Sequence, residues 1–120
     1  MLTEEKRLGD LGEQLAAEYL VLADYRILER NWRSGHHEVD IIAEWFGEIV
    51  FVEVKTRSKG DYRTALEAVD RSKRKFLISS ARHYLSMHKL DNPYRFDVIT
   101  VVGEREPFSV RHFKSAFLAE

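Results

Sequence analysis

The residues best suited to chemistry are two acids and a lysine carried by neighbouring segments: Asp40, Glu53 and Lys55. Alternate residues of a β-strand share a face, so Glu53 and Lys55 are expected to point the same way. If the two segments form a hairpin in which Glu44 pairs with Ile49, Asp40 falls opposite Glu53. Cross-strand neighbours have Cβ atoms about 5 Å apart, so two carboxylates and one ammonium would converge on one patch.

Such a patch is an unfavourable way to pair two strands unless it binds something. Like charges facing each other destabilise a sheet, and buried carboxylates are costly unless paired or bound to metal. Mg²⁺, or Mn²⁺ in its place, suits the arrangement because it prefers oxygen ligands and leaves room for water and substrate phosphate. Asp40 and Glu53 would be ligands, with the Val54 carbonyl as a third, and Lys55 would orient an attacking water. An ordinary cross-strand salt bridge on a solvated face is the alternative that the spacing leaves open.

Two helices and five strands are predicted to position this patch. Apolar residues at helical spacing predict an amphipathic helix at residues 3–22, with Thr3 as its N-cap, and a longer one at 64–88. Strands are expected at 25–33, on the edge of the sheet, and at 38–44, 49–56, 94–102 and 108–113. The order α-β-β-β-α-β-β indicates an α/β fold in which helices flank a mixed sheet.

Composition narrows the class of protein. The 120 residues fit a single domain spanning 1–120. The absence of cysteine excludes a disulfide scaffold, thiolate-bound zinc and a cysteine nucleophile. A charged N-terminus and the lack of a long apolar run predict a cytoplasmic protein that binds no membrane. The net charge of −1 is not that of a strongly basic nucleic-acid-binding protein, so phosphate contacts would have to come from a local basic surface.

Several stretches resemble known nucleases. In order they are GDLGEQLAAEYL, ILERNWR, HEVDII, VFVEVKTR, AVDRSKRK and RFDVITV. Asp40 followed by Glu53-Val54-Lys55 resembles the core motif of the PD-(D/E)-x-K superfamily, which includes restriction endonucleases and archaeal Holliday-junction resolvases. The chain as a whole resembles the bacterial YraN-like family of predicted nucleases. The resemblance implies a restriction-endonuclease-like fold and a Mg²⁺-dependent nuclease site for nucleic acid, above all DNA, branched or damaged DNA included.

The resemblance also carries over Glu13, which matches an acid that joins the site from the first helix of related nucleases. A helical wheel is compatible, because it places Glu13 at the margin of the apolar face beside Gly9, Ala16 and Leu20. The small side chains of Gly9 and Ala16 would let the helix approach the sheet closely. A glutamate that simply faces solvent is the alternative.

Basic residues near the predicted site are candidates for phosphate contacts. Lys73 interrupts the apolar stripe of the second helix, so it either snorkels from the edge of the core or reaches phosphate at the site. It belongs to a basic run that is either a solvated face or a source of nucleic-acid contacts. The nucleic-acid-binding candidates are Lys73, Arg57, Arg71, Arg74 and Lys75, with Arg33, Lys59 and Arg63 extending the rim. Asp97, next to Arg95, is expected to be structural and to lie outside the site.

Three functions are compatible with these patterns. The first is a metal-dependent endonuclease, and the second is a nucleic-acid-binding module with the nuclease fold but little or no turnover. The third is an interaction protein in which the acidic patch is a relic. The complete set of expected site residues argues against the third and does not separate the first two. By analogy with nucleases that cut two strands, a homodimer is also compatible.

Overall fold

The computed structural model describes residues 3–119, and its five strands form one sheet in the order β1-β2-β3-β4-β5. Neighbouring strands are antiparallel except β3 and β4, which are parallel. The predicted α/β class and order of elements are therefore confirmed. The strands are β1 (Arg26–Ser34), β2 (His37–Trp45), β3 (Glu48–Arg57), β4 (Tyr94–Val102) and β5 (Ser109–Phe117), and the helices are α1 (Glu4–Leu22), α2 (Tyr62–Glu67) and α3 (Arg71–Met87).

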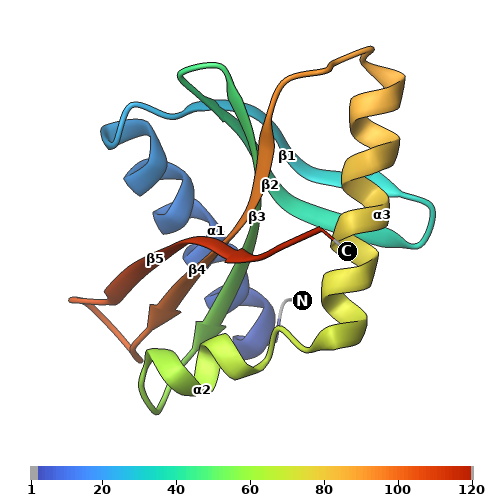
Figure 1. Ribbon diagram of the computed structural model, residues 1–120. Helices are drawn as coiled ribbons and strands as arrows, with labels where there is room; N and C mark the ends of the chain where they lie inside the picture. Colours follow the sequence, from blue (N-terminus) through green and yellow to red (C-terminus); the bar gives the residue numbers. More distant parts are fainter. Residues whose placement is uncertain (1–2, 120) are drawn as a thin grey trace.

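The two long helices cover opposite faces of the sheet, α1 on one side and α3 on the other (Figure 1). Alternation along β3 divides its side chains between them: Val50 and Val52 pack in the layer of α1, and Phe51 packs in the layer of α3. The sheet is thus buried on both faces at its centre. Among residues 3–119, no helix is both long enough and apolar enough to cross a bilayer.

The first helix begins as predicted, and the second differs. The Thr3 hydroxyl accepts a hydrogen bond from the Lys6 amide at 3.1 Å and caps α1. The single helix predicted at residues 64–88 is wrong, because the segment divides into α2 and α3. Asp70 causes the new start: its carboxylate accepts from the Lys73 amide at 2.9 Å and caps α3. This second cap fixes where α3 begins beside the sheet.

The strands follow the predicted order closely. β1 lies on the edge of the sheet as expected, and β5 is longer than the predicted strand at 108–113. Glu44 pairs with Ile49, which confirms the predicted hairpin register. The turn itself is shorter than predicted and consists of Phe46 and Gly47, both with positive φ, 48° and 87°. Two such residues suit the twist of a two-residue hairpin.

Helix α1 approaches the sheet closely at Gly12. The prediction that Gly9 allows this close approach is wrong. A Cβ on Gly12 would lie 2.0 Å from the Thr56 Oγ1, whereas nothing lies within 4 Å of one on Gly9. Ala16, the other small residue of the prediction, is fully buried in the α1 layer. The wheel identified the correct face but could not tell which glycine meets β3.

Candidate active site

Strands β2 and β3 stop pairing just before the predicted site. Their ladder ends with Ile41 opposite Val52, so the next residues along this register are Asp40 and Glu53. Instead of continuing the ladder, the Asp40 Oδ2 accepts a hydrogen bond from the Val54 amide at 2.8 Å. β2 meanwhile goes on pairing with β1 as far as His37. The Asp40 side chain therefore takes over a main-chain bond at the point where the two strands part.

A cleft of about 580 Å³ lies at this parting of the strands. Its walls come from the first turns of α1, the second half of β3 and the first turn of α3. All of the predicted metal ligands and Lys55 line it. The lining residues are Glu5, Leu8, Gly9, Glu13, Asp40, Glu53, Val54, Lys55, Thr56, Arg57, Ser58 and Lys73.

The Glu53 side chain lines this cleft and is only 2% exposed. Its Oε2 lies 3.3 Å from the Lys55 Nζ and 3.4 Å from the Lys73 Nζ. Its Oε1 is buried and has no hydrogen-bond partner among the described residues. A buried carboxylate oxygen without a partner is costly, which makes this atom a candidate ligand for a cation.

The Asp40 carboxyl is held in its protonated form more readily than usual. Burial raises its pKa, and the charge of Glu53 raises it further, to about 8. The Val54 amide opposes the rise, and Glu13 adds a smaller contribution to it. Two acids that repel each other inside a cleft are the arrangement in which a cation restores both to the charged form.

Glu13 faces the cleft, so the solvent-facing alternative is wrong. Its Oε1 accepts from the Asn31 Nδ2 at 2.7 Å, and the same nitrogen donates to Glu38 at 2.9 Å. Asn31 was missed by the sequence reasoning. It lies between Arg30 and Trp32, whose partners on β2 flank Asp40. The register of β1 against β2 would have pointed to it, but that register could not be read before the strands were paired.

The donor atoms in the cleft fit a small, hard cation. In a strand, the amide and carbonyl of one residue point to the same side, so the Val54 carbonyl faces the β2 side where its amide meets Asp40. Asp40, Glu53 and this carbonyl supply oxygen donors, and water would complete the shell of Mg²⁺. Within residues 3–119, no group of three or more His, Asp or Glu side chains could hold an ion by itself. The metal site made of two carboxylates and the main chain, with Glu13 outside the direct ligands, therefore stays a prediction.

The predicted basic residues divide between two places. Lys73 and Arg57 line the cleft, and the Arg57 guanidinium donates to the Thr56 carbonyl at 2.8 Å. Arg71, Arg74 and Lys75 line a different groove on another side of α3. Arg33, Lys59 and Arg63 are not among the residues lining the cleft, and Arg33 pairs with Glu38. The run of basic residues is thus continuous in sequence and separated in space.

Asp97 is structural, as predicted. It is fully buried and accepts hydrogen bonds from the Arg95 guanidinium, the His112 ring and the Ser115 amide. Arg95 also reaches Glu48 and the Tyr25 hydroxyl. This network ties β4 to β5 and to the start of β1 and β3, and none of its members lines the cleft.

Comparison with known proteins places the chain in a family. Residues 12–101 match the family model described as "Uncharacterised protein family UPF0102". The chain belongs to the UPF0102 family. A UPF0102 protein of Bacteroides fragilis is 43% identical over 116 residues, 97% of this chain and 96% of that protein. UPF0102 proteins of Bacteroides thetaiotaomicron and Porphyromonas gingivalis are 45% and 47% identical, covering 97% and 91% of this chain and 96% and 82% of theirs.

The UPF0102 match covers the centre of the cleft. It runs from residue 12 to residue 101 and so includes Glu13, Asp40, Glu53, Lys55 and Lys73. Family identity is confirmed by this match, and membership of the PD-(D/E)-x-K superfamily stays a prediction. What the UPF0102 cleft does is therefore argued from its own chemistry.

Proposed function

We propose that this UPF0102 protein is a divalent-metal-dependent nuclease that hydrolyses phosphodiesters of nucleic acid, with DNA as the favoured substrate. The observation that carries the proposal is the pair Asp40 and Glu53. Both carboxylates face one cleft where β2 and β3 part, and the Glu53 Oε1 is buried without a partner. The Val54 amide accounts for one oxygen of Asp40, and the two lysines account for one oxygen of Glu53, which leaves the Glu53 Oε1 for a cation.

The cation would be Mg²⁺ or Mn²⁺, held by Asp40, Glu53 and the Val54 carbonyl. When bound, it would neutralise charge on a scissile phosphate and lower the pKa of a water molecule. The Val54 amide fixes the Asp40 carboxylate through its 2.8 Å hydrogen bond, so one ligand is oriented before the cation arrives.

The two lysines of the cleft would interact with the substrate. Lys55 follows the acids on the same strand face, where its ammonium can orient water and offset negative charge on phosphate. Lys73 enters from α3 and brings a second ammonium to the same carboxylate, 3.4 Å away. Arg57 also lines the cleft and would contact a neighbouring phosphate.

One observation favours a second candidate, a nucleic-acid-binding module that does not cleave. Both lysines already neutralise the Glu53 Oε2, so part of the acidic charge is balanced without a cation. In that case phosphate would bind the lysines and no turnover would follow. Metal binding measured directly separates the two candidates.

Cleavage and metal binding should be measured side by side. Linear duplex, single-stranded, nicked and four-way DNA and RNA are incubated with Mg²⁺ or Mn²⁺, and Mn²⁺ binding is followed by calorimetry. Asp40→Asn should abolish Mn²⁺ binding and reduce cleavage by at least about 100-fold, the scale of losing one preorganised electrostatic contact. Asp91→Asn, at an exposed acid outside the cleft, is the matched control and should retain both.

The outcomes are distinct. Cleavage that persists in Asp40→Asn and in Lys55→Gln would refute the proposed site. Intact nucleic-acid binding without Mn²⁺ binding and without cleavage of any substrate would favour the binding module. Absence of Mn²⁺ binding to the wild-type chain would reject the metal site.

A further inference from the structure

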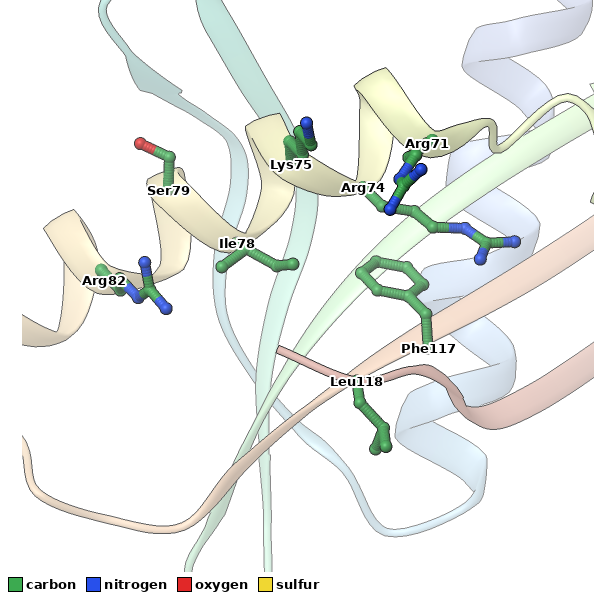
Figure 2. Close-up of a pocket in the computed structure, with 8 residues that line it drawn as sticks. All are labelled: Arg71, Arg74, Lys75, Ile78, Ser79, Arg82, Phe117 and Leu118. Atoms are coloured by element: carbon green, nitrogen blue, oxygen red, sulfur yellow. The ribbon is translucent and has the colours of Figure 1, made fainter. Parts of the chain in front are cut away.

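A second concave surface lies on α3 away from the cleft. We call it the α3–β5 groove; its volume is about 500 Å³, and none of the described residues lines both it and the cleft. Figure 2 shows basic side chains along one face of α3, with Phe117 and Leu118 approaching from the end of β5. Its lining residues are Arg71, Arg74, Lys75, Ile78, Ser79, Arg82, Phe117 and Leu118.

The described residues that line the α3–β5 groove carry charge of one sign. Four of them are basic and none is acidic, although the chain as a whole carries a net charge of −1. The basic residues recur at positions i, i+3, i+4 and i+11 from Arg71, which places them along one side of the helix. Local charge of this kind attracts an anionic ligand regardless of the overall balance.

The groove is also partly preorganised. The Arg74 Nε donates to the Val69 carbonyl at 3.1 Å, and its guanidinium lies 5.5 Å from the centre of the Phe117 ring. Ile78 and Phe117 are buried and form a firm floor, while Leu118 is 75% exposed. A guanidinium held by packing and a hydrogen bond loses less freedom when it binds phosphate than one on a loose surface.

The length of the groove suits an extended polyanion. From Arg71 to Arg82 the helix rises about 16 Å, at roughly 1.5 Å per residue. One strand of duplex DNA presents a charge about every 3.4 Å, so this length spans about five phosphates. Arg71 is also only two residues from Lys73, whose ammonium lies in the cleft. A nucleic-acid strand bound along the groove would therefore run towards the end of α3 that borders the cleft.

We propose that the α3–β5 groove binds the phosphate backbone of a nucleic-acid strand, without sequence preference and without metal, at a distance from the phosphate in the cleft. The choice of nucleic acid over an acidic polypeptide rests on the proposed function, because the cleft at the start of the same helix is suited to phosphodiesters. The groove thus supplies the basic surface that composition does not reveal. Its binding energy is independent of the Asp40 and Glu53 pair.

Binding is tested by fluorescence anisotropy of labelled duplex and single-stranded DNA in a chelator, over a range of salt. The double variant Arg71→Gln/Lys75→Gln removes two exposed cations and leaves Arg74 on Phe117. We expect affinity to fall on the order of tenfold and the salt slope to fall by about two, one for each lost phosphate contact. Lys89→Gln/Arg105→Gln removes the same charge from exposed positions outside the groove and should leave both nearly unchanged.

Each outcome of these binding measurements either supports or overturns the proposed role of the α3–β5 groove. Equal weakening in the two double variants means that general charge alone attracts DNA, and it overturns the groove. Polyglutamate that binds the wild-type chain while DNA does not would assign the groove to an acidic polypeptide and also overturn it. DNA binding that depends on Arg71 and Lys75, in a protein that cleaves nothing with Mg²⁺ or Mn²⁺, would retain the groove and reject the nuclease.

Discussion

Two buried acids on the neighbouring strands β3 and β4 have opposite surroundings. Asp97 is fully buried, and both its oxygens accept hydrogen bonds. Glu53 is 2% exposed, and one of its oxygens has no partner among the described residues. Burial alone would raise the pKa of Asp97, but His112 and Arg95 outweigh it and hold that pKa below its ordinary value.

The pKa of Asp40, the acid next to Glu53, is shifted in the opposite direction to that of Asp97. Burial and the charge of Glu53 raise the pKa of Asp40. The comparison shows that burial by itself does not decide whether an acid is structural or functional. The groups around the carboxylate decide its role. An acid that is fully paired with cations and amides stabilises the fold, whereas an acid that faces a second acid is suited to binding a cation.

The largest effect is expected from breaking the satisfied network. Asp97→Asn leaves the Arg95 guanidinium, whose side chain is 10% exposed, without its anionic partner on β4. Loss of one member of a buried pair destabilises a protein by about 3–5 kcal/mol. Urea unfolding measures the change, and a loss under about 1 kcal/mol would show that the network contributes little.

A smaller loss of stability is expected from a substitution where α1 meets the sheet beside the cleft. In Gly12→Ala the new methyl group would collide with Thr56, so α1 must move away from β3. Overpacking of this kind costs about 1–3 kcal/mol. Gly9→Ala is the matched control, since open space surrounds that position and alanine favours a helix by about 1 kcal/mol. Equal unfolding free energies for the two variants would contradict the close contact.

Neutralising one acid of the Asp40 and Glu53 pair should stabilise the protein. In a chelator at pH 8, Asp40→Asn removes the repulsion from Glu53 and keeps an oxygen that can accept from the Val54 amide. We expect a gain on the order of 1–2 kcal/mol, the scale of the repulsion between two unit charges about 4 Å apart in a partly solvated site. Chemical unfolding of both proteins tests this, and destabilisation by Asp40→Asn would mean that the pair is not strained.

Metal should reverse that order of stability. A cation that binds only the folded wild type stabilises it by about 2.7 kcal/mol at 100 times its dissociation constant, which exceeds the gain expected from Asp40→Asn. Asp40→Asn, having lost a ligand, should gain much less from Mn²⁺. Thermal unfolding with and without Mn²⁺ measures both shifts, and equal shifts would show that the ion binds elsewhere.

The two acids should also give opposite pH dependence. The pKa of Asp40 is raised in the folded state, so the folded protein binds more protons than the unfolded chain between the ordinary value, 3.8, and about 8. Stability relative to Asp40→Asn should therefore fall as pH rises through this window. The pKa of Asp97 is lowered, so its contribution is present above pH 3.8 and is lost on further acidification. Unfolding free energies in a chelator, measured from pH 3 to pH 8.5, show whether the two trends differ in sign.

The sequence by itself determined the order of elements and the centre of the cleft. Alternation along β3 fixed the shared face of Glu53 and Lys55, and the short turn before Glu48 fixed the register that brings Asp40 to Glu53. These are local relations, because the spacing of side chains along a strand and across a hairpin follows from backbone geometry. A helix start at Asp70 could in principle have been predicted as well, but the apolar stripe continues on both sides of Asp70 and predicted a single helix.

The tertiary structure alone decided which distant residues join or leave the site. Asn31 reaches Glu13 because α1 packs against β1, and Gly12 rather than Gly9 meets β3, at Thr56. The packing of α3 sends Lys73 to the cleft and its basic neighbours to another groove. These relations depend on how separate elements pack against one another. A single sequence does not encode that packing as a period or a spacing, so only the folded chain shows it.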